Sequence, residues 1–482
     1  MKYRPSKKFL LILAPLAVLV ICIGFGILHE LEKSKTRPIP GEITFRSAKF
    51  EARPAPLVPV LKAEASGSVW DWFTEKYPNL FSWTHDASQR TPSGFGDHYF
   101  KLGASKDPGD QAKFRELNRL SEAWYQKLLL RYPELAVTLK SIPDAQNGFL
   151  KWLDLADKIK ATNSESISKI TFPKEIDDFF AQKAAWNPTA AKDWITQNQS
   201  LVDQIHAIGL LPEHSVNGIP LDRLGPIPGR FAKNCGDILM LEARLAADQG
   251  NQAAALESIR SARGLADHFS EIETPDLLAA TVKILIQLDL ESRVLSEILP
   301  ALPPGQVDLA AWENALRPTV STPAEFAKLM KGEWHAGTRQ FILPMLMDAG
   351  EPLAPPDSGE LLDHLAQGSL DIVRTYETAN LRDLSTLGLP PTADTSPLSR
   401  NSRQIVETLG MGREAWLQGW KRAQSASAMT QAAFAIMKGQ AIPQDPIYGL
   451  DYQWDPATRV LSMPAGKSFD GLQIKPIKVP KF

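Results

Sequence analysis

The strongest constraint in this chain is a run of 20 residues without a charged side chain, residues 9–28. A helix rises about 1.5 Å per residue, so this run as a helix is about as long as the ~30 Å hydrocarbon core of a bilayer is thick. It therefore predicts a transmembrane helix, and the lipid bilayer is the first partner that we expect. A cleavable signal peptide is the alternative, but its apolar region is usually shorter, and no A-x-A cleavage site follows this run. A lipoprotein signal ending at Cys22 is a weaker alternative, because the bulky Ile21 precedes that cysteine.

The charges before the run predict its orientation. Lys2, Arg4, Lys7 and Lys8 precede it, and a short basic tail before a single span usually stays in the cytoplasm. The expected location is the bacterial inner (plasma) membrane, with one span, a cytoplasmic N-terminus and an extracytoplasmic body. Such a body holds one cysteine, Cys235, so we expect no disulfide within it.

The overall composition excludes several classes of protein. Hydrophobic residues at 44% and charged residues at 22% are typical of a globular chain rather than a disordered or polytopic one. The 53 basic and 55 acidic side chains leave no basic excess for phosphate contacts. We therefore expect no nucleic-acid partner.

Changes in composition along the chain predict its organisation. Residues 1–8 are the cytoplasmic tail and residues 9–28 the span. The following segments are a Pro-rich stalk at 29–68, an aromatic-rich segment at 69–109, a helical body at 110–440, and a C-terminal hairpin and tail at 441–482. Prolines favour extended, poorly packed chain, which is why we interpret residues 29–68 as a stalk.

The predicted fold class is all-α, an irregular helical bundle or a helical-hairpin array similar to tetratricopeptide repeats. Apolar residues recur at steps of three and four through the body, as expected of amphipathic helices. The first predicted helix is capped by Asp110 and ends at Tyr132-Pro133. Gly250-Asn251 lies between two further helices, residues 231–248 and 252–269, so these should form an antiparallel pair.

Other helices are predicted from prolines at helix starts and from apolar stripes. Pro173 and Pro188 precede helices at residues 174–185 and 189–208. Thr274-Pro275 caps a helix that carries apolar residues on both sides, so we expect it to be buried nearly all round. Beyond the last long helix, residues 452–454 and 459–462 flank Asp455-Pro456, which suits a type I turn, and predict a short β-hairpin.

The aromatic-rich segment holds the candidate binding residues. Nine aromatic residues occur within 31 positions, among them Trp70, Trp72 and Trp83. Tryptophan faces stack on sugar rings and attract cations.

Two His-Asp pairs lie in the same region. These are His85-Asp86 and Asp97-His98, and such pairs could supply acid/base chemistry if the fold joined them. Packing of the segment onto the body is the alternative interpretation of the whole group. We therefore name these residues as candidates for binding, and none as catalytic.

The remaining motifs predict no cofactor and no metal. Residues 410–415 spell G-x-G-x-x-A, but helical sequence precedes them where a dinucleotide site needs a strand. Ser166 and Lys169 spell S-x-x-K without its companion motifs. His206 and His214 are a weak metal signal, and we expect them to be structural.

The C-terminal sequence resembles the ending of an uncharacterised group of bacterial proteins. Those proteins are single-span, membrane-anchored and helix-rich, and they end in a D-P-x-x-G hairpin tail. The resemblance lies in Arg422-Ala423-Gln424, Ile442-Pro443, Asp445-Pro446, Tyr448-Gly449, Tyr452-Gln453-Trp454 and residues 455–459. The D-P-x-x-G portion also looks like the tail of type II secretion pseudopilins, but the glutamate expected just inside the span is missing. The resemblance implies a fold plan and a location, and no reaction.

Together these features favour a non-catalytic cell-envelope interaction or scaffold protein. Helical arrays commonly bind through extended surfaces, so the expected partner is a protein or an envelope polymer. The alternative is an envelope hydrolase or carbohydrate-active enzyme that uses the His-Asp pairs.

Overall fold

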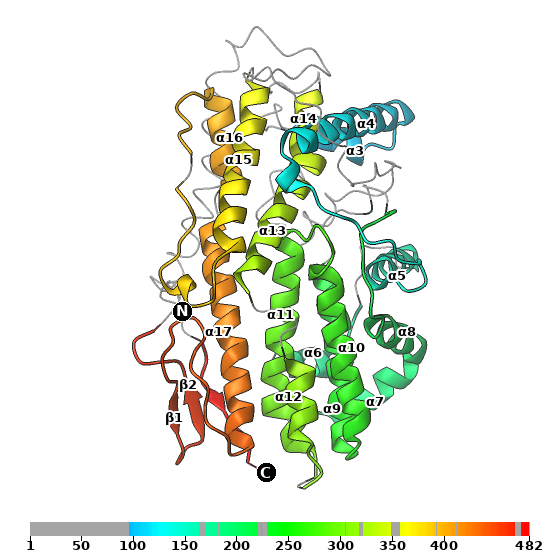
Figure 1. Ribbon diagram of the computed structural model, residues 1–482. Helices are drawn as coiled ribbons and strands as arrows, with labels where there is room; N and C mark the ends of the chain where they lie inside the picture. The colour runs from blue at the N-terminus through cyan, green and yellow to red at the C-terminus, as the bar shows by residue number, and fades with distance from the viewer. Residues whose placement is uncertain are drawn as a thin grey trace, which may run out of the picture.

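The computed structural model describes residues 96–162, 170–181, 183–219, 223, 229–303, 305–317, 322–348, 357–391, 393–410, 413–467 and 474–481. This part of the chain is rich in helices and carries a small three-stranded sheet near its C-terminus (Figure 1). The predicted span at 9–28, the stalk at 29–68 and most of the aromatic-rich segment lie outside the described residues. Within them, no helix is both long enough and apolar enough to cross a bilayer.

The elements follow one another along the chain as a long series of helices. The α-helices are α3 (Asp97–Ala104), α4 (Pro108–Arg131), α5 (Gly148–Thr162), α6 (Lys174–Phe180), α7 (Pro188–Gln197), α8 (Gln199–Gly209), α9 (Gly229–Asp248), α10 (Gln252–Ser270), α11 (Leu277–Arg293), α12 (Leu309–Leu316), α13 (Pro323–Ala336), α14 (Leu343–Met347), α15 (Ser358–Glu377), α16 (Arg400–Gly410) and α17 (Arg413–Met437). Short 3-10 or π turns are η2 (Pro133–Leu135), η4 (Val294–Ile298), η5 (Leu299–Ala301), η6 (Gly337–Ile342) and η7 (Asp383–Ser385), and the strands are β1 (Gln453–Asp455), β2 (Val460–Ser462) and β3 (Ile477–Lys478).

The helical pair predicted around Gly250-Asn251 is confirmed. Gly250 takes a φ of 69°, which a glycine adopts without a steric penalty, and ends α9. The Asn251 side chain accepts a hydrogen bond from the backbone N–H of Ala254 and caps α10. A third helix joins this pair closely, because α8 crosses α10 where Gly209 meets Gly264. A Cβ on Gly264 would lie 1.9 Å from the Gly209 carbonyl oxygen, so only glycine fits there.

Several predicted helix boundaries are wrong. Asp107, not Asp110, caps α4, because Pro108 occupies the first helical position and Asp107 accepts from the next two N–H groups. The helix predicted at 189–208 is broken at Asn198 into α7 and α8. The cap of α11 is Asp276, which accepts from the Ala279 N–H, rather than Thr274-Pro275.

Two hydrophobic cores lie at opposite ends of the described fold. The larger one joins α5 through α12 with α17 and the sheet, around Trp152, Trp312 and Phe326. The smaller one joins α3 and α4 with α14 and α16, around Tyr125 and Leu343. Helices α13 and α15 contribute residues to both cores and pack along each other, so they connect the two ends of the molecule (Figure 1).

The predicted C-terminal hairpin is confirmed and gains a third strand. Strands β1 and β2 pair antiparallel with Trp454 opposite Leu461, and β3 pairs antiparallel with β2. Asp455 accepts hydrogen bonds from the N–H groups of Ala457 and Thr458, which fixes the turn. Arg459 occupies the position of the glycine in D-P-x-x-G and takes a φ of 55°. Its guanidinium donates to the carbonyl oxygens of Val479 and Pro480, so it ties β3 to the hairpin.

Candidate functional site

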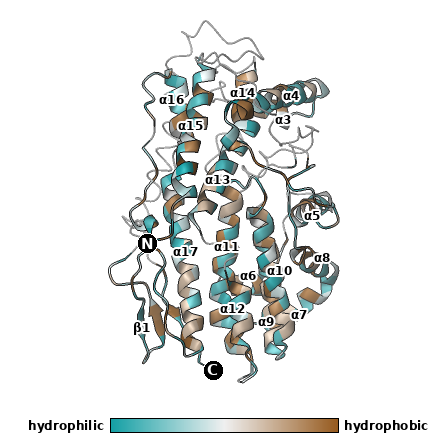
Figure 2. Cartoon of the chain, in the orientation of Figure 1, coloured by the Kyte–Doolittle hydropathy of each residue, from teal (hydrophilic) through white to brown (hydrophobic). Residues whose placement is uncertain are grey.

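Helix α11 is less buried than its sequence predicts. Leu285 exposes 55% of its surface, and Ile284 and Leu288 are partly exposed, although apolar residues occupy both sides of the helix. Among the described residues, α17 packs against one side of this face and leaves Leu285 exposed. Figure 2 shows apolar stretches of α11 and α17 running beside each other, and the two helices are in contact.

A groove with a volume of about 820 Å³ lies where α11 and α17 approach the C-terminal sheet. One wall is α11 and η4, the other is α17, and the third side is the β1–β2 turn with the tail at residues 474–481. The apolar part of its lining, here called the floor, includes Leu288, Leu295, Met429 and Ile477. Segments from four separate parts of the sequence therefore build one depression.

The rim of this groove is positively charged. Lys475, Lys478 and Lys481 line it from the tail and are exposed, and Arg422 and Arg459 line it from α17 and β2. Arg459 also lies over the Trp454 ring, 5.8 Å from its centroid. Five cationic side chains around an apolar floor favour an anionic ligand with apolar groups.

The acidic side chain among the described residues of the lining, Glu291, is used within the fold. Its carboxylate accepts hydrogen bonds from Ser427, from Gln287 at 2.9 Å and from Thr430 at 3.3 Å. Burial raises the pKa of Glu291 above that of an ordinary carboxyl group. Through these hydrogen bonds Glu291 joins α11 to α17.

The outer edge of the sheet at this groove is closed to strand addition. The Val479 N–H donates to the Arg459 carbonyl oxygen at 2.9 Å, so the backbone of Val479 faces β2. Because backbone directions alternate along a strand, Pro476, Lys478 and Pro480 face away from β2. Two of these three residues have no N–H, and prolines on an edge strand prevent pairing with another strand.

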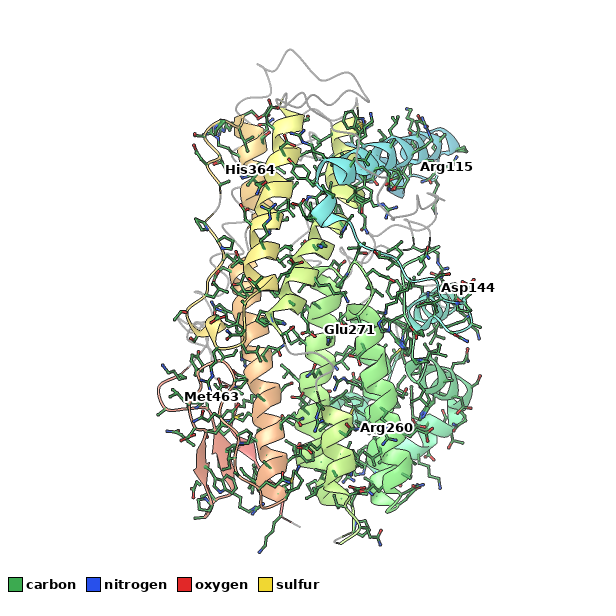
Figure 3. The ribbon with its side chains drawn as sticks, viewed as in Figure 1. Arg115, Asp144, Arg260, Glu271, His364 and Met463 are labelled. Carbon is green, nitrogen blue, oxygen red and sulfur yellow. The ribbon has the colours of Figure 1, made fainter. Side chains whose placement is uncertain are left out.

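A second, smaller cavity follows the groove along the same α11–α17 seam, and the two share Leu288. Its volume is about 50 Å³, enough for one or two water molecules. Lys283 donates to Glu271 at 2.7 Å, and Lys328 lies 3.6 Å from the same carboxylate. Figure 3 labels Glu271 at the middle of the molecule. Glu325 completes this group, with Oε1 buried and 4.0 Å from the Lys283 Nζ.

Glu325 should make stability depend on pH. Burial raises its pKa to about 7, and the charges that face it are Lys283 on α11, Glu271 and Asp267 from the α10 side, and Lys328 on its own helix. A carboxyl whose pKa is higher in the folded than in the unfolded state stabilises the fold at low pH, and this contribution is lost as pH rises through 7. We expect Glu325→Gln to stabilise the protein relative to wild type by about 2 kcal/mol more at pH 8 than at pH 5.

Urea denaturation at the two pH values measures this difference. Glu175→Gln is the matched control, because Glu175 is exposed on α6 and its replacement should give the same difference at both pH values. An effect of Glu325→Gln on stability that does not change with pH would contradict the raised pKa of Glu325.

Of the candidate residues in the aromatic-rich segment, two lie within the part of the chain that the structure describes. Trp70, Trp72, Trp83, His85 and Asp86 lie outside the described residues. Asp97 and His98 begin α3, where His98 Nδ1 lies 2.5 Å from Asp348 Oδ2 at the end of α14. His98 is therefore paired with a carboxylate 250 positions away in the sequence.

Among the weaker motifs, the S-x-x-K residues Ser166 and Lys169 lie outside the described residues, and the others have structural explanations. His206 Nδ1 lies 3.0 Å from Glu242. The His214 ring lies against the His268 ring, with centroids 5.7 Å apart. His206 and His214 therefore have different partners. In the described ranges, no three His, Cys, Asp or Glu side chains are placed to hold a metal ion. Of the G-x-G-x-x-A residues, Gly410 ends α16 and Arg413 begins α17, so a helix and not a strand precedes the motif.

Comparisons with known proteins found no match: no family model, no curated protein and no solved structure is significantly similar to this chain. The α11–α17–sheet groove, defined as the 820 Å³ depression and its lining, is therefore assigned on its geometry alone. Sequence reasoning missed it, although Lys475, Lys478 and Lys481 recur every three residues in the tail.

Proposed function

We propose that this protein is a membrane-anchored, extracytoplasmic interaction protein of the bacterial envelope, and that it binds an anionic partner in the α11–α17–sheet groove without catalysing a reaction. The observation that carries the binding part is the groove itself, with an apolar floor and a rim of five cationic side chains. The uncharged run at 9–28 and the basic residues before it support the anchoring part.

The described body supports binding better than catalysis. Its long helices form a rigid wall on two sides of the groove, and the acidic residue in the lining is engaged in hydrogen bonds within the fold. A general acid or base needs access to the substrate proton, which Glu291 lacks. The helical hairpins therefore serve as a scaffold that presents the groove.

An envelope hydrolase is the second candidate, and it rests on one observation. Asp348 is buried and holds the His98 ring, which is 40% exposed, as a carboxylate holds an imidazole in acid/base catalysis. The same pair also fastens α3 to the end of α14. In this case His98→Ala would abolish turnover of an envelope glycan while leaving polyanion binding intact.

Binding of a simple polyanion tests the leading proposal. We expect the full chain, purified in a neutral detergent, to bind fluorescent poly-L-glutamate saturably and to ignore poly-L-lysine, as measured by fluorescence anisotropy. The affinity should fall as salt rises, because exposed charges are screened. Equal binding of the two polymers, or binding of neither, would overturn the groove's assignment.

Reporter fusions test the anchoring. A periplasm-dependent reporter, alkaline phosphatase, fused after residue 40 or at the C-terminus should be active, and a cytoplasm-dependent reporter at the same places inactive. The opposite pattern would place the body in the cytoplasm and contradict the orientation predicted from Lys2, Arg4, Lys7 and Lys8.

A further inference from the structure

We infer that the partner of the α11–α17–sheet groove is an acidic amphipathic helix belonging to another protein. This inference rests on the proposed function and names the chemistry and conformation of the ligand. Four properties of the groove carry it: the spread of its charges, its apolar floor, its closed strand edge and the charge of this chain's own N-terminal region.

The charges on the rim are spread too widely for a single anionic group. Lys475 and Lys481 are six positions apart, so at about 3.3 Å per residue of extended chain their backbones lie at most about 20 Å apart. Arg422 lies on a different element, α17, across the groove. One phosphate or carboxylate contacts only a part of this rim, so the ligand carries several negative charges in a row.

The floor distinguishes an acidic protein segment from a bare polyanion. Leu288 and Ile477 are partly exposed and present apolar surface in the groove, while Leu295 and Met429 in its lining are buried. Leu285, which is 55% exposed, extends this apolar stripe along α11 beyond the groove. A polyphosphate or a polyglycan phosphate leaves this surface in contact with water, whereas a helix with one apolar face covers it.

The closed strand edge determines the conformation of the ligand. A peptide in an extended conformation has unpaired backbone groups, and it gains most affinity by pairing with the edge of a sheet. Pro476 and Pro480 remove that possibility here, because the backbone positions that face outward next to Lys478 have no N–H. A helix makes its backbone hydrogen bonds within itself, so the groove can recognise it only through its side chains.

This chain's own N-terminal region is a poor ligand for the groove. Residues 29–95, which the predicted topology places on the same side of the membrane as the groove, contain nine basic and eight acidic side chains, so this segment has no net negative charge to match the rim. An acidic ligand is therefore expected from another chain.

Designed peptides test the inference on the full chain in neutral detergent. The probe is a fluorescent peptide of about 18 residues, long enough to form a helix, with leucines at i, i+3, i+4 and i+7 and glutamates on the opposite face. Its control has the same composition in an order without an apolar face. We expect the amphipathic peptide to bind at least about tenfold more tightly than the scrambled one, because only it covers the apolar floor.

Two variants separate the floor from the rim. Leu288→Gln should abolish the preference for the amphipathic order and leave poly-L-glutamate binding within about twofold, because it changes no charge. Leu210→Gln is the matched control, since Leu210 is 41% exposed at the end of α8, away from the groove, and its replacement should leave both affinities unchanged.

The outcomes are distinct. Poly-L-glutamate bound as tightly as the amphipathic peptide, or equal binding of the two peptide orders, would overturn the inference and leave the proposed function standing. Tighter binding of inorganic polyphosphate than of the amphipathic peptide would also overturn it, in favour of an envelope polymer. Failure of all anionic probes to bind would overturn the proposed function itself.

Discussion

Glu122→Ala is expected to lower the free energy of unfolding by about 3–5 kcal/mol, the largest effect of a single substitution that we predict. Glu122 Oε2 on α4 lies 2.7 Å from Arg339 Nε on η6, and the two side chains are only 7% and 9% exposed. Arg339 also lies over the Tyr125 ring, 4.9 Å from its centroid. Removing the carboxylate leaves a guanidinium buried in the smaller core without its counter-charge.

Urea denaturation followed by tryptophan fluorescence measures this effect. Glu116→Ala is the control, because Glu116 forms an exposed pair with Arg119 on the same helix and should contribute at most about 1 kcal/mol. Glu122→Leu combined with Arg339→Met should restore most of the stability, since the buried pair is then replaced by apolar side chains. A loss below about 1 kcal/mol for Glu122→Ala would show that this pair does not hold α4 in place.

Replacing Lys475, Lys478 and Lys481 together by glutamine is expected to weaken the binding of poly-L-glutamate about tenfold to a hundredfold at about 0.1 M salt. Each exposed charge contributes about 0.5–1 kcal/mol to attraction of an anion, and three such contributions give this range. Stability should change little, because all three side chains are exposed and their charges are not needed for the packing of β3.

The matched control carries the same change of charge elsewhere. Lys101, Lys106 and Lys113 are exposed on or beside α3 and α4, at the opposite end of the molecule from the sheet (Figure 1). Their replacement by glutamine should leave anion binding within about twofold of wild type, because charges separated by more than about 10 Å are largely screened. An equal loss for both triple variants would mean that the polyanion responds to net charge and not to the groove.

The features predicted correctly depend on residues close together in the sequence. Gly250-Asn251 specifies the end of one helix and the start of the next, and Asp455-Pro456 specifies a turn. Tyr132-Pro133 ends α4 because proline disrupts a continuing helix. Where two local signals competed, the prediction failed: Asp107 with Pro108 caps α4 more effectively than Asp110.

The features that the sequence could not provide depend on contacts between distant segments. Leu285 has the apolar character of a buried residue, and only the arrangement of α11 and α17 leaves it exposed. The two π turns precede Pro300 and Pro344, which lack the N–H group for the next helical hydrogen bond. From the sequence alone, such a π turn could not be distinguished from the end of a helix.

The candidate site was missed for the same reason. Lys475, Lys478 and Lys481 have the pattern of an exposed basic tail, and they form one rim with Arg422 only because β3 pairs with β2 beside α17. Conversely, the sequence identified His98 only through its neighbour Asp97, and the partner that the fold gives it, Asp348, comes from a distant helix end. Adjacency in sequence does not predict which side chains a helix directs toward a neighbour.

Site-specific photo-crosslinking tests the central claim, that the α11–α17–sheet groove holds an acidic amphipathic helix, most directly. A photo-reactive amino acid in place of Ser296, an exposed residue on the groove wall, should crosslink to the fluorescent amphipathic peptide on irradiation of the full chain. The same amino acid in place of the exposed Ser200 on α8 should give no crosslink above background. Excess unlabelled peptide should remove the crosslink at position 296. Equal labelling at the two positions, or no labelling at position 296 under conditions in which the peptide binds, would contradict the claim.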